Sequence, residues 1–265
     1  MAAAAFPANI NLADLNGTNG FRLSGVASGD VSGSAVSTAG DVNGDGIDDL
    51  LIGAPDADPN AVSAGASYVV FGGAEVGGRR GSLKLSALDG TNGFRLSGVA
   101  IYDHSGSAVS TAGDVNGDGI DDLLIGAPFA IPPGGVLTGA SYVVFGADRV
   151  GSDDGNLELS DLNGTNGFRV SGAALGDLSG FDVSTAGDVN GDGADDLLIG
   201  ASGADPNGNR SGASYVVFGG AGVGESGNLE LSALDGTNGF RLSGVAAADG
   251  SGRAVNRAGD VNGDG

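Results

Sequence analysis

Short runs of apolar residues, separated by glycine, aspartate, asparagine or proline, dominate the pattern along the chain. In Phe21-Arg-Leu-Ser, apolar and polar residues alternate, which is typical of a strand with one buried face. Tyr68-Val-Val-Phe is apolar throughout, which indicates a strand that is buried on both faces. No segment longer than a turn shows the period of a helix. The pattern therefore predicts an all-β fold of short strands and tight turns.

Four such runs recur as one unit along the chain. In the first unit they are Gly-Phe-Arg-Leu-Ser-Gly from Gly20, Ser-Gly-x-x-Val from Ser32, Asp-Leu-Leu-Ile-Gly-Ala from Asp49 and Gly-Ala-Ser-Tyr-Val-Val-Phe-Gly from Gly65. The aspartates that open the loop before the third run are 73, 74 and 72 residues apart: Asp41, Asp114, Asp188 and Asp260. We expect one array over residues 1–265, with approximate repeats 20–92, 93–166 and 167–238 and a truncated repeat 239–265.

Four strands in each repeat fit a β-propeller blade of four antiparallel strands. A parallel β-helix is the rival architecture, but its rungs are usually much shorter than 73 residues. A further Leu-x-Leu-Ser-x-Leu run, from Leu83, Leu157 and Leu229, is either a short strand or a helical turn that packs between blades. One arginine recurs in each repeat, for example Arg95. Two interpretations are open: it lines a site for an anionic ligand, or, as is more usual, its charge keeps an exposed strand from aggregating.

The loop that opens with Asp41 carries oxygen-bearing side chains at its positions 1, 3, 5 and 9. Alternate residues of a tightly wound loop point inward, and the residue at position 7 adds a backbone carbonyl. Calcium takes six to eight such oxygens, whereas magnesium needs a stricter octahedron and zinc prefers nitrogen and sulfur. The predicted calcium ligands are Asp41, Asn43, Asp45, Ile47 and Asp49; Asp114, Asn116, Asp118, Ile120 and Asp122; and Asp188, Asn190, Asp192, Ala194 and Asp196.

Other interpretations of these loops fit less well. Asn-Gly and Asp-Gly also make plain hairpin turns, but three complete copies keep every ligand position. An EF-hand needs a glutamate at position 12 and flanking helices, and Ile52 stands there within an apolar run. The loops therefore predict calcium bound between two strands.

Composition narrows the classes of partner. Acidic residues outnumber basic ones 33 to 11, so the chain repels nucleic acid and anionic membranes and attracts divalent cations. The chain has no cysteine, which excludes disulfides and thiolate metal sites. No stretch approaches the roughly 18 apolar residues of a membrane span, and residues 1–9 have no basic start of a secretory signal.

The sequence Gly-Asp-Val-Asn-Gly-Asp-Gly-x-Asp-Asp-Leu-Leu-Ile-Gly-Ala-Pro, at 40–55 and 113–128, resembles the FG-GAP repeat of integrin α-chain propellers. In the third repeat Ser202 replaces the proline, and the Phe-Gly pair of the family becomes Ser-Gly, as at Ser105. The resemblance implies calcium between the first two strands of a blade, extracellular placement and a role in adhesion or ligand binding.

A ring of seven blades, as the resemblance implies, needs roughly 500 residues at this period. The fourth loop offers only Asp260, Asn262 and Asp264 and stops before positions 7 and 9. We therefore expect an incomplete ring, an open arc of three blades, and weak or no calcium binding by the fourth loop.

The function that these features predict is a non-catalytic, calcium-binding module outside the cell, with an unknown protein or glycan as its ligand. The alternatives are a structural spacer and the accessory propeller of a secreted hydrolase. His104, the only histidine, lies where the other repeats have Val31, Leu178 and Gly250, so we interpret it as loop variation. We expect no contact with nucleic acid, no membrane insertion, and self-association through open blade edges as a further possibility.

Overall fold

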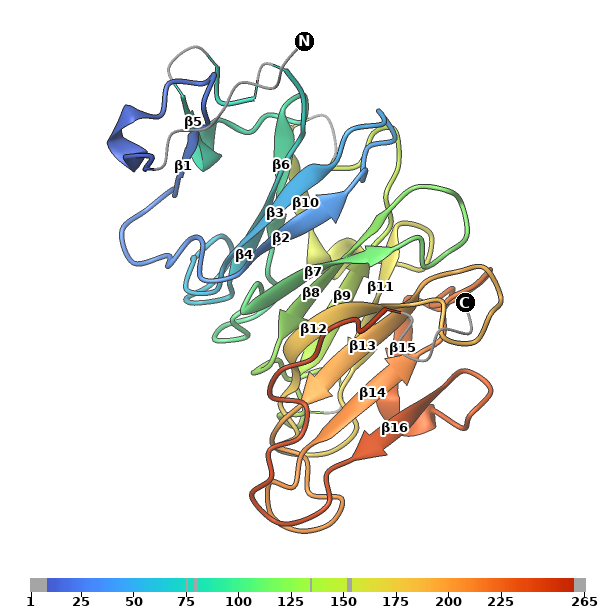
Figure 1. Cartoon of the computed structure of the whole chain (residues 1–265). Helices are drawn as coiled ribbons and strands as arrows, with labels where there is room; N and C mark the ends of the chain where they lie inside the picture. The colour runs from blue at the N-terminus through green and yellow to red at the C-terminus, as the bar shows by residue number, and fades with distance from the viewer. Residues whose placement is uncertain (1–8, 75, 79–80, 134, 152–153, 260–265) are drawn as a thin grey trace.

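The computed structural model describes residues 9–74, 76–78, 81–133, 135–151 and 154–259. Within these ranges the regular elements are strands and four single turns of 3-10 helix (Figure 1), and none of the helices is long or apolar enough to cross a membrane. The all-β prediction is therefore confirmed. The strands are β1 (Arg22–Ser24), β2 (Val36–Gly40), β3 (Asp49–Ala54), β4 (Ala66–Val70), β5 (Ser82–Lys84), β6 (Gly93–Ser97), β7 (Ala108–Gly113), β8 (Asp122–Ala127), β9 (Ala140–Val144), β10 (Asn156–Glu158), β11 (Gly167–Ser171), β12 (Ser179–Gly187), β13 (Asp196–Ala201), β14 (Ala213–Val217), β15 (Asn228–Glu230) and β16 (Gly239–Ser243).

Each main sheet is an antiparallel series of four strands whose outer strand comes from the following repeat. The first sheet runs β2-β3-β4-β6, the second β7-β8-β9-β11 and the third β12-β13-β14-β16. In the first sheet β6 pairs with β4 so that Phe94 lies opposite Val69. Blades of four antiparallel strands are thus confirmed, and each blade takes its last strand across the boundary of the sequence repeat.

A short fifth strand lies at the outer edge of the first two blades. It runs parallel to its neighbour: β10 pairs with β6, β15 with β11, and β5 in the same way with β1. Each of these strands leads directly into a 3-10 turn, η3 (Leu85–Ala87), η4 (Leu159–Asp161) or η5 (Leu231–Ala233), and η1 (Leu12–Asp14) lies before β1. The leucine run is therefore both a strand and a helical turn, and it buries Leu85, Leu159 and Leu231.

The repeated arginine fastens this fifth strand to the blade. Arg95 Nε donates to Asn156 Oδ1 at 3.0 Å, and Arg169 Nε donates to Asn228 Oδ1 at 3.0 Å. Both arginines are half-buried. For Arg95 and Arg169 the interpretation that the arginine keeps an exposed edge from aggregating is wrong, because a short strand at the end of the same repeat, β10 or β15, already covers that edge.

The hydrophobic core lies between blades. One cluster joins Leu51 and Phe94 of the first blade to Leu123 and Ile125 of the second, and another joins the second blade to the third in the same manner. The strands β4, β9 and β14, each of which lies inside its sheet between two other strands, are buried along their whole length. This explains why the Tyr-Val-Val run has no polar face.

The blades form an open row in the part of the chain that the structure describes. The inner strands β2, β7 and β12 contact one another in this order, and Figure 1 shows the sheets following each other from the β1 end to the β16 end. No closed ring is formed within the described ranges, so the predicted incomplete ring is confirmed for them.

The serine that replaces the family's phenylalanine lies at the junction between blades. Ser105 and Ser179 are fully buried, and their hydroxyl groups have no hydrogen-bond partner among the described residues. Backbones approach closely here: a Cβ on Gly53 would overlap the carbonyl of Gly106. Small side chains therefore fill this junction.

Replacing Ser105 by alanine should leave the free energy of unfolding unchanged or raise it by about 1 kcal/mol, because an unpaired buried hydroxyl opposes folding. Urea unfolding followed by circular dichroism measures this. Ser107→Ala is the matched control: its hydroxyl donates to the His104 carbonyl at 2.7 Å, and its loss should lower stability. Marked destabilisation by Ser105→Ala would contradict this account of the junction.

Candidate metal centre

The three complete loops lie at the same end of successive blades. They join β2 to β3, β7 to β8 and β12 to β13, so each connects the inner strand of a blade to the next strand. All fifteen predicted ligands of these loops are within the described residues. Asp260, Asn262 and Asp264 lie outside the described residues.

The side chains at positions 1, 3 and 5 turn into their own loop. In the first loop Asp41 accepts hydrogen bonds from the amides of Asp45 at 2.9 Å and Gly46 at 2.8 Å. Asn43 Oδ1 accepts from the Asp45 amide, and Asp45 Oδ1 accepts from the Ile47 amide, each at 2.9 Å. The second and third loops repeat these contacts. These hydrogen bonds turn the oxygens of positions 1, 3 and 5 towards the amides of their own loop, and their role as metal ligands stays a prediction.

Glycine makes the winding possible. Gly44 and Gly46 have φ values of +73° and +85°, in the left-handed region that other residues rarely adopt. Their counterparts in the second loop, Gly117 and Gly119, have φ values of +78° and +88°. The backbone can therefore present alternate residues to the centre of the loop.

The aspartate at position 9 is buried and anchors the loop to the blade. Asp122 Oδ2 accepts from the Val115 amide at 2.9 Å, and its Oδ1 accepts from the Gly146 amide at 2.9 Å. Asp49 and Asp196 make the same pair of contacts. This carboxylate thus ties the start of its loop to the end of the third strand of the same blade.

Burial and like charge make these carboxylates hard to ionise. The pKa of Asp49 is raised to about 6 and that of Asp122 to about 7, chiefly by desolvation. The two backbone amides that donate to each carboxylate lower its pKa and so offset part of this effect. The carboxylates at positions 5 and 1 make smaller contributions to both raised pKa values. The pKa of Asp196 is raised for the same reasons. Each loop therefore holds mutually repelling acids that a cation would stabilise in their charged form.

The donor set fits a hard divalent cation. Each loop supplies three carboxylates and one side-chain amide oxygen, and the residue at position 7 offers its backbone carbonyl. All of these oxygens are typical calcium ligands. Among the described residues, no three of these acids lie together in a cluster that could hold a metal ion. The Asn43 amide donates to Asp45 Oδ2 at 3.3 Å, so this contact would have to open for both side chains to face an ion.

The aspartate at position 8 has a role that the sequence analysis missed. Asp121 Oδ2 accepts a hydrogen bond from the Asp41 amide at 2.9 Å, and Asp195 Oδ2 accepts from the Asp114 amide at 3.1 Å. Each thus reaches the preceding loop. The signal was present, because an acid stands at position 8 of every complete loop, including Asp48.

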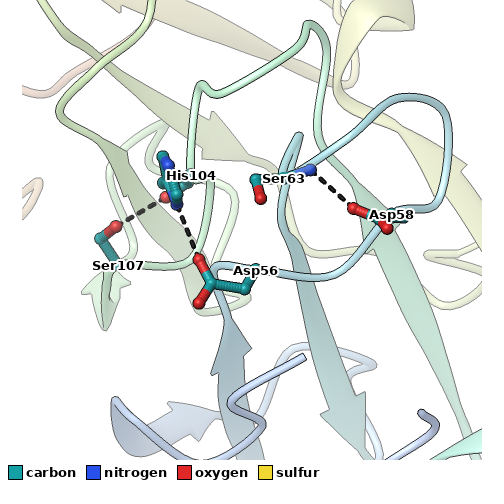
Figure 2. Close-up of polar contacts among 5 residues, drawn as sticks. All are labelled: Asp56, Asp58, Ser63, His104 and Ser107. Carbon is teal, nitrogen blue, oxygen red and sulfur yellow. Dashed lines mark hydrogen bonds and ion pairs between the residues drawn. The ribbon is translucent and has the colours of Figure 1, made fainter. Parts of the chain in front are cut away.

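His104 has an acidic partner that the sequence did not reveal. Figure 2 shows its Nδ1 facing Asp56 Oδ1 at 2.9 Å, while the Ser107 hydroxyl donates to the His104 backbone carbonyl. None of the contacts marked in the figure joins a serine hydroxyl to the imidazole ring. His104 has a φ of +52°, and Val31 and Leu178 at the corresponding positions have +56° and +55°. It occupies a left-handed turn that the repeats share.

A model of the FG-GAP repeat matches three segments of the chain, residues 32–70, 105–144 and 179–217. Each segment ends with the third strand of a blade and contains one complete loop. The chain belongs to the FG-GAP repeat family. The outer strand of each blade lies beyond the matched segment, in agreement with its origin in the next repeat.

Integrin alpha chains and a phospholipase D are among the proteins that are similar to this chain. Integrin alpha-5 of Xenopus laevis is 32% identical over 201 residues, which cover 72% of this chain and 17% of the relative. Integrin alpha-PS2 of Drosophila melanogaster is 33% identical over 195 residues, covering 72% and 13%. Phosphatidylinositol-glycan-specific phospholipase D of Bos taurus is 34% identical over 201 residues, covering 75% and 22%. The chain thus spans less than a quarter of the length of these relatives.

The glycine before the first two FG-GAP loops, Gly40 or Gly113, is expected to be essential for the contact with position 8. A Cβ on Gly113 would overlap the Asp195 carboxylate, whereas a Cβ on Gly117 meets nothing within 4 Å. Both glycines have positive φ, so alanine is strained at either site. Without calcium, Gly113→Ala should lower the free energy of unfolding by about 2 kcal/mol more than Gly117→Ala, since it also breaks a charged hydrogen bond. Equal losses in chemical denaturation would refute this explanation.

Proposed function

We propose that this chain is a calcium-binding FG-GAP propeller segment of an extracellular protein, where it serves adhesion or ligand binding without catalysis. The observation that carries the proposal is the threefold recurrence of one oxygen donor set on the same end of successive blades. A single Asn-Gly turn would have little weight, but three loops with the same oxygen-bearing side chains on equivalent blades favour a common ligand.

The charge of the loops supports a cation as that ligand. Among the described residues, the His104–Asp56 contact is the one ion pair, so no lysine or arginine neutralises the loop acids. Residues 41, 43, 45, 47 and 49 would hold the ion in the first loop, and the corresponding residues would do so in the other two. Calcium, when bound, supplies the positive charge that offsets the repulsion between the carboxylates.

The role expected of these ions is to stiffen the loop end of each blade. The loop side chains already hold the backbone amides of their own loop, and the aspartate at position 9 fixes the loop to the third strand. Ordering of the remaining oxygens around an ion would lock the two inner strands together. The strand-to-strand loops would then present a rigid surface to a protein or glycan ligand.

Placement outside the cell is consistent with weak calcium sites. Extracellular modules bind calcium with dissociation constants of about 10⁻⁴ to 10⁻³ M, which match the calcium-rich medium outside cells. The similarity to integrin alpha chains supports the adhesive role. The strongly acidic surface speaks against nucleic acid as the ligand.

A second candidate function is that of an accessory propeller in a secreted hydrolase. The similarity to phosphatidylinositol-glycan-specific phospholipase D favours it. In this case the calcium loops would stabilise a propeller beside a catalytic domain. The two candidates share the role of the loops and differ in the domains that accompany them.

Titration calorimetry should show three calcium ions bound by this 265-residue chain, with affinity in the extracellular range. Asp45→Ala should remove one of the three, because it deletes a carboxylate at position 5 of one loop. Asp58→Ala, outside the loops, is the control and should leave three. A folded chain that takes up no calcium would disprove the proposed function.

Calcium binding should release protons near pH 6.5 and release far fewer near pH 8.5. Burial keeps part of the Asp49 and Asp122 population protonated near neutral pH, and a bound cation lowers the pKa of both. The measured heat of binding should therefore depend on the ionisation enthalpy of the buffer at the lower pH. A heat that is independent of the buffer at about pH 6.5 would count against this prediction.

A further inference from the structure

Successive loops are joined to one another by direct hydrogen bonds. At the first junction the Asp121 carboxylate accepts from the Asp41 amide at 2.9 Å, and the Asp121 amide donates to the Asp41 carbonyl at 3.4 Å. At the second junction Asp195 contacts Asp114 in the same two ways, at 3.1 and 3.0 Å. The position 8 aspartate of one loop thus makes two hydrogen bonds to the position 1 aspartate of the loop before it, and we call this pair of bonds the clasp.

A second line of hydrogen bonds runs through the position 9 carboxylates. Asp49 accepts from the Val42 amide, and the Val42 carbonyl accepts from the Ala147 amide of the next blade at 3.0 Å. The neighbouring Gly146 amide donates to Asp122. From Asp122 the pattern repeats through Val115, Gly220, Gly219 and Asp196 to Val189. A series of hydrogen bonds between backbone groups and the position 9 carboxylates therefore connects all three loops.

The junction is formed wherever a neighbouring blade is present. Asp121 and Asp195 are half-buried, whereas Asp48 is exposed and accepts no hydrogen bond within the described part of the chain. Val42 and Val115 are buried under the next blade, and Val189 is 52% exposed. Gly40 leaves the space that the Asp121 carboxylate occupies. The clasp is thus a feature of the contact between blades.

We propose that the position 8 aspartates are positioning residues that couple neighbouring calcium sites, so that calcium in one loop raises the affinity of the loop before it. This inference rests on the proposed function. Position 1 is a predicted ligand, and its peptide is held by the next loop. An ion that orders the second loop therefore also orders Asp41, and the first loop loses less freedom on binding.

The coupling is expected to be positive. Repulsion between two bound ions acts across exposed loops and is screened by salt, while the hydrogen bonds of the clasp act directly on the ligand-bearing backbone. Coupling free energies between linked sites typically correspond to a fivefold or larger change in affinity. Asp41 and Asp121 are 80 positions apart in sequence, so local chain stiffness does not account for such an effect.

The experiment follows the amide signals of Gly46 and Gly119 by NMR during titration of the 265-residue chain with calcium chloride. Both amides donate to the position 1 carboxylate of their own loop, so each reports one site. Asp118→Ala removes a ligand from the second loop. It should weaken calcium binding at the first loop by about fivefold, although it lies outside that loop.

Asp121→Ala should abolish this dependence, so that Asp118→Ala then changes first-loop affinity by less than about twofold. Asp121→Asn removes the same charge but keeps an oxygen that accepts from the Asp41 amide, and it should retain the coupling. Asp48→Ala is the matched control: it deletes an acid at the same loop position without removing a clasp, and the fivefold effect should persist. Circular dichroism confirms that each variant is folded.

If Asp121→Ala fails to fold, the second junction provides the same test. There Asp192→Ala should weaken second-loop binding, read from Gly119, and Asp195→Ala should remove that dependence. Unchanged first-loop affinity in Asp118→Ala, or equal loss of coupling in Asp48→Ala, would overturn the inference while leaving three calcium sites. If calcium moves none of the glycine signals, the proposed function fails, and the coupling fails with it.

Discussion

The arrangement of each blade depends on one buried carboxylate at position 9 of its loop. Asp122 accepts one backbone amide from the start of its loop and another from the end of the third strand, and Asp49 and Asp196 do the same. These two contacts fix the loop relative to three of the four strands. A carboxylate without them would be costly to bury, and the amides without it would lose their acceptor.

The same carboxylates link the stability of the fold to its electrostatics. Desolvation and the acids at positions 1 and 5 oppose the charge on Asp49 and Asp122, as their raised pKa values show. A divalent cation would remove this conflict without new packing. The acids that oppose one another's charge lie on loops that the blades hold at one end of the structure.

Besides the side chains of the core, backbone groups of neighbouring blades also come into close contact. The leucines and valines of the strands lie in the clusters between the blades. A Cβ on Gly53 or Gly126 would overlap a glycine carbonyl of the next blade, and a Cβ on Gly200 would overlap the carbonyl of Gly252 in the segment after β16. This explains why the glycine of the Gly-Ala-Pro motif persists in the third repeat, where serine replaces proline. The close approach also brings neighbouring loops within hydrogen-bond distance.

The sequence by itself determined the strands, the period and the chemistry of the loops, because these depend on local features such as the unbroken apolar run from Tyr68 and the oxygens after Asp41. The tertiary structure decided which segments meet. It placed β6 in the blade of the preceding repeat, set Arg95 against Asn156 and joined Asp121 to the loop of Asp41. The physical reason is that two of these contacts, the pairing of β6 and the hydrogen bond from the Asp41 amide, use backbone amides and carbonyls. Almost every residue carries those groups, so side-chain patterns do not reveal which of them will pair.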